Sequence, residues 1–215
     1  MAQLFPEWSN RVPRMLLVGS VFFVTAVVFF FWHFGSHDYL EVGYAPKQPI
    51  DYSHRLHAGQ LGIDCRYCHA SVENSAVASI PSTQTCMNCH AQIKVDSPKL
   101  ALLHESWETG APIEWVKVHD LPQYSHFNHS AHVNVGVGCE SCHGRIDRME
   151  VVMQAAPMSM GWCLDCHNNP GPNLRPVDQV TTMGWVAPPN QFELAAEIIA
   201  RKNIAPPVYC NACHY

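Results

Sequence analysis

A five-residue pattern, Cys-x-x-Cys-His, occurs five times in this sequence and uses all ten cysteines. In a c-type haem attachment site, the two thiols bond to the two vinyl groups of one porphyrin and the adjacent histidine binds the iron. The pattern therefore predicts five covalently bound c-type haems. The copies, called motifs 1 to 5 below, are Cys65–His69, Cys86–His90, Cys139–His143, Cys163–His167 and Cys210–His214.

Each motif assigns two thioether bonds and one iron ligand. A zinc site would take four ligands from two cysteine pairs, with no histidine required after each pair. A disulfide framework would not need a two-residue gap every time, so haem attachment explains more of the pattern. The predicted attachment residues are Cys65, Cys68, Cys86, Cys89, Cys139, Cys142, Cys163, Cys166, Cys210 and Cys213, and the first axial ligands are His69, His90, His143, His167 and His214.

Each iron also needs a second axial ligand, which low-spin electron carriers take from histidine or methionine. His54 and His57 precede motif 1 as a His-x-x-His pair, and His129 and His132 precede motif 3 in the same way. Two imidazoles three residues apart on a helical turn can reach different rings. We therefore expect all four to bind iron, as in small class III cytochromes, with His119 as a fifth ligand.

The remaining histidines are weaker candidates. His33 and His37 lie at the end of an apolar stretch, and His126 is crowded by the His-x-x-His pair that follows it. His104 is ranked lowest of the single histidines between the motifs.

Methionine is the alternative second ligand, because all methionines near the later motifs could present a thioether sulfur. Met149 comes six residues after His143 and is the favoured candidate, ahead of Met160 and Met183. The competing interpretation is that these methionines fill the core. An iron held by histidine and methionine would have a higher potential than one held by two histidines.

Residues 15–34 contain no Asp, Glu, Lys or Arg and are long enough to cross a bilayer once as a helix. A cleaved signal peptide would have a shorter apolar region and a better cleavage site than the sequence Phe-Gly-Ser-His-Asp that follows. Basic residues precede the stretch and acidic residues follow it. The positive-inside rule therefore predicts a single-pass protein of the inner (cytoplasmic) membrane, with its haem domain on the periplasmic, extracytoplasmic side.

The sequence predicts one transmembrane helix followed by an irregular, short-helical domain whose core is packed with haem, because 16 prolines and 12 glycines prevent long regular elements. Helices are expected around 99–107 and over 191–202. The second is capped by Asn190 and carries a packed side made of Phe192, Leu194, Ala195, Ile198 and Ile199. An alternating run at 112–119 is typical of a strand. The expected divisions are a cytoplasmic head (1–14), the membrane helix (15–34), a linker (35–50), a first two-haem module with its connector (51–120), a second two-haem module (121–170), and a proline-rich segment with a helix and the fifth haem (171–215).

Several motifs between the haem sites resemble one family. They are Cys86-Met-Asn-Cys-His90, Val118-His-Asp-Leu-Pro122, Phe127-Asn-His-Ser-Ala-His-Val133 and Pro157-Met-Ser-Met-Gly-Trp-Cys-Leu-Asp-Cys-His167. With the N-terminal span, the sequence is similar over nearly its whole length to the pentahaem cytochrome subunit (ActA) of alternative complex III. That resemblance implies an iron–sulfur subunit, integral quinol-binding subunits and monohaem cytochrome c subunits as partners in the respiratory chain. It also implies electron transport from menaquinol to a cytochrome c or a terminal oxidase.

Three functions remain open from the sequence. The first is a non-catalytic electron-transfer subunit of a menaquinol:acceptor oxidoreductase, favoured because the histidines and methionines suffice to cap every iron. The second is an enzyme reducing a small nitrogen or sulfur oxide, which would need a five-coordinate haem. The third is a self-contained, membrane-anchored quinol dehydrogenase that feeds periplasmic reductases. Nucleic acid is not an expected partner, because the chain has a net charge of −5 and no basic stretch.

Overall fold

The computed structural model describes residues 4–215, so the first three residues of the predicted head lie outside it. The described chain is helical and irregular. No strand forms among these residues, and the single β-type pairing is an isolated antiparallel bridge between Val137 and Leu174. The predicted fold class is thereby confirmed. The chain divides into two compact units, one ending at Glu41 and the other running from Val42 to Tyr215.

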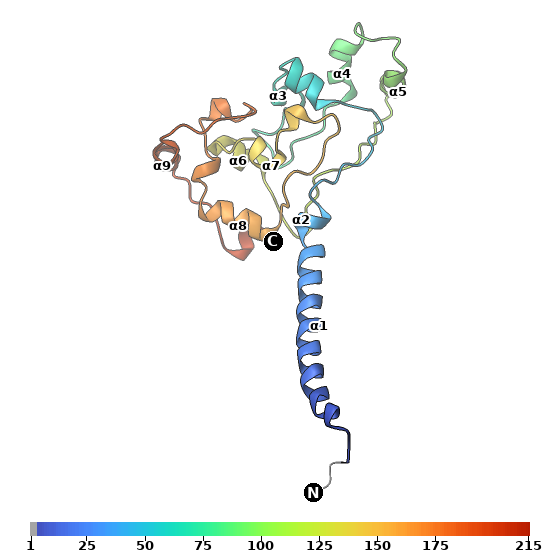
Figure 1. The fold of residues 1–215 in the computed structure, drawn as a ribbon. Coiled ribbons are helices and arrows are strands. Elements are labelled where there is room, and N and C mark those ends of the chain that lie inside the picture. Colours follow the sequence, from blue (N-terminus) through green and yellow to red (C-terminus); the bar gives the residue numbers. More distant parts are fainter. Residues whose placement is uncertain (1–3) are drawn as a thin grey trace. The chain divides into compact units, whose positions relative to one another are not determined.

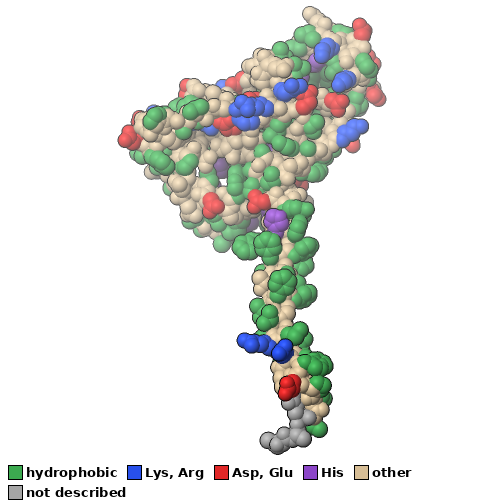
Figure 2. Space-filling view, viewed as in Figure 1, with side chains coloured by type: hydrophobic (Ala, Val, Ile, Leu, Met, Phe, Trp, Pro, Cys, Tyr) green, Lys and Arg blue, Asp and Glu red, His purple; other side chains and the backbone are tan. Residues whose placement is uncertain are grey.

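The first unit is one long apolar helix with short flanking turns. A 3-10 turn, Glu7–Arg11, leads into α1 (Val12–Phe34), and α2 (His37–Leu40) follows. Together the 3-10 turn and α1 are long and apolar enough to cross a membrane, and none of their side chains is buried. Figure 2 shows hydrophobic side chains along this helix and basic ones near its N-terminal end. The helix begins three residues earlier than the sequence predicted.

The second unit is built from short helices joined by irregular segments (Figure 1). Frequent proline and glycine keep each helix to a few turns. Its elements are a π-helical turn (Arg55–Gln60), α3 (Cys65–Cys68), α4 (Thr83–His90), α5 (Ala101–Thr109), α6 (His129–Val135), α7 (Glu140–His143), α8 (Met160–Asn168) and α9 (Gln191–Lys202), with 3-10 turns at Pro98–Leu100, Ile146–Arg148, Gly171–Asn173, Val177–Gln179 and Cys210–Ala212.

The apolar core of this unit is small. Its largest fully buried side chains are Leu174, Val180 and Ile198. α9, which carries Ile198, packs against the 3-10 turn Gly171–Asn173. Most other apolar side chains are partly or largely exposed. A core of this size is what the sequence led us to expect of a domain whose interior is completed by porphyrins.

Three local expectations need correction. The alternating run 112–119 is not a strand, because the Gln48 side chain satisfies the backbone of Val116 in place of a neighbouring strand, accepting from its N–H at 3.0 Å and donating to its carbonyl at 2.9 Å. α9 has the predicted bounds, but Asn190 makes no side-chain capping bond. Phe192, expected on the packed side of that helix, is exposed.

The segment before motif 1 is fixed to the segment after motif 3. The Arg55 N–H donates to the Met149 carbonyl at 2.9 Å, and the Arg55 side chain pairs with Glu150 at 2.7 Å. Gly59 approaches the backbone of Asp147 so closely that a Cβ at Gly59 would lie 2.2 Å from the Asp147 carbonyl oxygen. Glycine at this position therefore allows the two expected modules to pack together.

Candidate haem-binding sites

All five motifs lie on helical turns. Motif 1 forms α3, motifs 2 and 4 end α4 and α8, motif 3 forms α7, and motif 5 lies on the 3-10 turn Cys210–Ala212. Residues three apart share one face of such a turn, so both thiols of a motif can reach one ligand. In motifs 1, 3 and 5, the histidine N–H donates to the carbonyl of the first cysteine at 2.9–3.0 Å, which places the imidazole beside the thiols. No disulfide joins any of the ten cysteines in the described chain.

The motif histidines are oriented by their Nδ1 atoms. Four of the five donate Nδ1–H to a backbone carbonyl, and because a carbonyl can only accept, each of these rings keeps a lone pair on Nε2. The four bonds are His69 to Ser79 (2.7 Å), His90 to Ile93 (3.0 Å), His167 to Pro207 (2.6 Å) and His214 to Tyr124 (2.7 Å). An imidazole held in this way is prepared to bind a metal through Nε2.

His143 of motif 3 is the motif histidine that does not belong to this set of four. Burial, and next the nearby rings of His119 and His129, lower its pKa to about 3. The ring is therefore neutral at physiological pH, which is the state that binds a metal.

Three of the candidate second ligands have the same orientation. His57, His129 and His132 donate Nδ1–H to the carbonyls of Ser53, Ala76 and Asn128 at 2.8–2.9 Å. His126 is reversed, because its Nε2 bonds to the Tyr215 carbonyl at 2.8 Å. The nitrogen that would bind iron is thus free in the first three rings and engaged in His126.

The spacing between imidazoles tests whether a haem iron fits. A metal–imidazole bond is about 2 Å long, and the ring centre lies a little over an ångström behind the nitrogen, so two rings on one iron have centres about 6 Å apart. The ring centres of His57 and His90 lie 6.3 Å apart, those of His129 and His143 6.4 Å, and those of His132 and His167 6.0 Å. The residues present therefore fit an iron between each of these three pairs.

His54 is associated with motif 1. Burial, followed by the neighbouring His69 and His57, lowers its pKa to about 4. Its Nδ1 is buried without a hydrogen-bond partner. An orphaned nitrogen beside the motif 1 histidine is consistent with a group not made of protein.

His119 and Met149 both lie near motif 3, where His129 already faces His143. The ring of His119 is 4.5 Å from that of His143 and perpendicular to it, which is too close for an iron between them. Met149 is buried, with its methyl group beside Gly144. Both remain predictions as axial ligands. The buried Nε2 atoms of His119 and His104 have no hydrogen-bond partner, although the sequence analysis ranked His104 among the weaker candidates.

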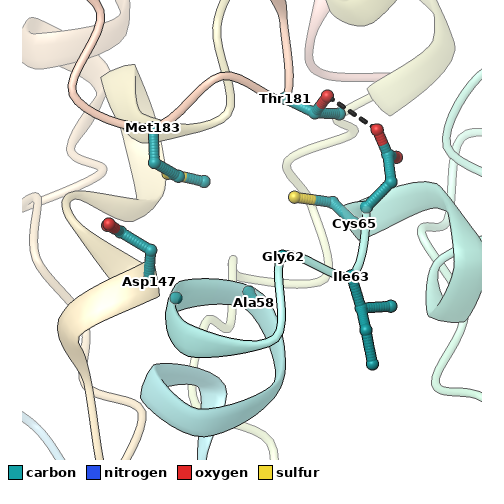
Figure 3. A pocket seen from close by; sticks show the side chains of 9 residues that line it. Ala58, Gly62, Ile63, Cys65, Asp147, Thr181 and Met183 are labelled. Carbon is teal, nitrogen blue, oxygen red and sulfur yellow. Dashed lines mark hydrogen bonds between the residues drawn. The ribbon is translucent and has the colours of Figure 1, made fainter.

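A cavity of about 300 Å³ adjoins motif 1 (Figure 3). The Cys65 thiol and the Met183 thioether both point into it, and Thr181 donates to Asp64 at 3.0 Å on one side. Met183 was expected near the later haems because of its place in the sequence. The structure instead folds residues 181–183 back onto motif 1, a long-range contact that spacing along the chain does not reveal.

A buried ion pair supports motif 3, and the sequence analysis missed it. Arg175, whose side chain is 6% exposed, donates to Glu140 at 3.0 Å. Glu140 lies inside motif 3 and also accepts the N–H groups of Gly184 (2.6 Å) and Trp185 (2.9 Å). The guanidinium of Arg175 lies over the Trp185 ring, 5.4 Å from its centre. The variable position of the motif thus fixes the segment that follows motif 4.

Comparison with known proteins gives one informative similarity. The chain is 34% identical over 121 residues to the multihaem cytochrome c subunit of a menaquinone reductase from Nitratidesulfovibrio vulgaris, which covers 56% of this chain. The chain spans about half the length of that relative (55%). No protein-family model matches the sequence. The similarity supports a multihaem c-type cytochrome and does not single out alternative complex III.

Proposed function

We propose that this chain is an electron-transfer subunit that carries five c-type haems for a quinol-linked respiratory complex. The observation that carries the proposal is the set of three histidine pairs whose ring centres lie 6.0–6.4 Å apart, each joining a motif histidine to a histidine outside the motifs. When bound, a haem with two histidine ligands exchanges one electron and leaves no coordination site for a substrate. The chain's own residues orient and bury the rings.

The relative's role in a menaquinone reductase supports a quinol-linked complex. Within the proposal, this complex is alternative complex III. Its partners are an iron–sulfur subunit, integral quinol-binding subunits and monohaem cytochrome c subunits, and its electron acceptor is a cytochrome c or a terminal oxidase. α1 would cross the inner membrane once, with the haem domain outside the cytoplasm. Ser20 and Thr25 bond back to the helix backbone at 2.9 and 2.8 Å, which lowers their cost in lipid.

Haem content and partners test this function together. After gentle detergent extraction, we expect five haems per chain in a pyridine haemochrome assay, together with an iron–sulfur protein and polytopic subunits. The isolated complex should oxidise a menaquinol analogue and reduce a cytochrome c. A chain that carries no covalent haem would overturn the proposal, and a chain purified alone that oxidises menaquinol would favour the self-contained dehydrogenase.

The relative also suggests a second candidate, in which electrons flow toward menaquinone. The same haem row could serve either direction, because the potentials of the terminal donors decide the flow. Potentiometric titration of the complex distinguishes the two, since quinol oxidation requires haem potentials above that of the quinone couple.

A further inference from the structure

We infer that two side chains outside the motifs, Asn173 and Tyr52, are positioning residues that raise the potentials of the haems at motifs 4 and 1, because each donates a hydrogen bond to a cysteine sulfur. The inference rests on the proposed haem binding and concerns residues that the motifs themselves do not reveal. Each donor is directed at the second cysteine of its motif, which is Cys166 for Asn173 and Cys68 for Tyr52.

The amide group of Asn173 lies against motif 4. Its Nδ2 donates to the Cys166 sulfur at 3.4 Å, across seven positions of the chain. Burial raises the pKa of the Cys166 thiol, and the bond from Asn173 opposes that rise. The amide therefore presents the positive end of its dipole to the sulfur and stabilises negative charge there.

The turn that carries Asn173 is held in place from its two sides. The side chain of Gln191, which is buried, donates to the carbonyl of Gly171 at 2.8 Å and to that of Leu174 at 2.7 Å. Leu174 itself is fully buried. A donor on a support of this kind keeps its direction, because its neighbours are already fixed by packing and hydrogen bonds.

Tyr52 has the corresponding place at motif 1. Its hydroxyl hydrogen-bonds the Cys68 sulfur. Two candidate iron ligands fix the ring, since it stacks on His57 with ring centres 4.5 Å apart and meets His54 edge-on at 4.8 Å. These two contacts determine where the hydroxyl lies.

Phe127 shows that packing on the histidines does not require the hydroxyl. It stands two residues before the second His-x-x-His pair, as Tyr52 stands before the first. Its ring meets His129 edge-on at 4.8 Å and lies 4.5 Å from the ring of His132. Both aromatic rings thus hold their histidines at the same distances, and the Tyr52 hydroxyl is left for its bond to sulfur.

Haem attachment decides which hydrogen bonds of the cysteine sulfurs are kept. When a thiol adds to a vinyl group, the sulfur bonds to one vinyl carbon and its hydrogen goes to the other, so the resulting thioether can accept but not donate. The bond between the thiols of Cys65 and Cys139 is therefore lost. The bonds from Asn173 and Tyr52 are kept, with the amide and the hydroxyl as donors.

A donor beside a thioether sulfur favours the reduced haem. Reduction adds one electron, and the positive end of a fixed N–H or O–H dipole in a partly buried site stabilises the added charge. Asn173 therefore raises the potential of the haem at motif 4, and Tyr52 raises that of the haem at motif 1. Because neither residue binds iron, the axial ligation and its spectra do not depend on them.

Variants that remove or reverse each donor test the inference in the full-length, haem-loaded protein. N173L removes the amide at similar volume, and N173D places a carboxylate beside the sulfur. Potentiometric titration should show one of five potentials lowered in N173L, the same one lowered further in N173D, and a different one lowered in Y52F. All three variants should keep five haems per chain by haemochrome assay and the wild-type EPR spectrum.

The control is N190L, which removes an exposed amide that makes no capping bond at the start of α9, and it should shift no potential. Haem removal identifies the site that each donor affects. In C163A/C166A, N173L should shift no potential while Y52F still shifts one, and in C65A/C68A the two effects should be reversed. The order of N173L and N173D needs neither haem-deletion variant, so the test stands if one of them fails to fold.

Three results would overturn the inference. They are wild-type potentials in N173L and Y52F, a potential in N173D that lies above that of N173L, and loss of a haem in N173L, which would mean that Asn173 serves attachment instead. Each of these results leaves the haem-binding function intact, because only a wild-type chain without covalent haem contradicts that function.

Discussion

At the scale of single residues, the histidines outside the motifs show how far side-chain chemistry could be read from the sequence. The His-x-x-His spacing predicted four ligand candidates, and the structure places three of them at a metal-like spacing from a motif histidine. The sequence does not predict how each imidazole ring is oriented. Whether a ring presents Nε2 or Nδ1 depends on a distant carbonyl, such as that of Ala76 for His129, and no local pattern encodes that partner.

The first residue-scale prediction concerns His132. In H132A, the iron at motif 4 should lose its second ligand and become high-spin, because no other imidazole faces His167 in the described chain. Reduced H132A should bind carbon monoxide at about one haem in five, measured by difference spectra and EPR. H37A is the control and should bind no more carbon monoxide than the wild type. Unchanged spectra in H132A would show that His132 is not a ligand.

The second prediction concerns the Glu140–Arg175 pair. E140Q leaves a buried guanidinium without its carboxylate, so the free energy of unfolding should fall by about 3 kcal/mol. Chemical denaturation followed by far-UV circular dichroism measures the loss. D120N breaks the exposed ion pair with Lys117 and should change little. Equal stability of E140Q and the wild type would mean that the pair contributes only positioning.

At the scale of elements, α5 and α9 were predictable because their apolar periodicity is local. The run 112–119 was not, because alternation predicts a strand only where another strand is available, and here the Gln48 side chain fills that role. The contact between the π-helical turn and the 3-10 turn Ile146–Arg148 was equally invisible, since it depends on a backbone approach between distant segments.

The close approach of Gly59 to the backbone of Asp147 gives a prediction at the scale of elements. G59A should disrupt the packing of these two turns, because its Cβ would lie 2.2 Å from the Asp147 carbonyl oxygen and backbone atoms cannot easily move aside. Thermal unfolding of the haem-loaded protein should begin at a lower temperature. G19A, which meets nothing within 4 Å, is the matched control. An unchanged melting temperature in G59A would show that the contact is dispensable.

At the scale of the whole molecule, the small apolar core of the second unit should make its folding depend on bound haem. The second unit buries few large apolar side chains among the residues described, so protein burial alone should not hold it together. Expressed without the cytochrome c maturation machinery, it should show weak, non-cooperative unfolding and rapid proteolysis. Circular dichroism and limited proteolysis measure both, with the haem-loaded chain as reference. A cooperative transition in the haem-free chain would refute this dependence.

The residues between the paired cysteines have a consequence for how interchangeable the five motifs are. Tyr67 and Asn88 contact each other, and Glu140 fixes a distant loop. These positions are written as x in the pattern, yet their side chains make specific contacts outside their own motif. Exchanging the middle residues of motifs 1 and 3 would keep both haem attachment sites, but it would remove the Tyr67–Asn88 hydrogen bond and the bonds that Glu140 accepts from residues 184 and 185.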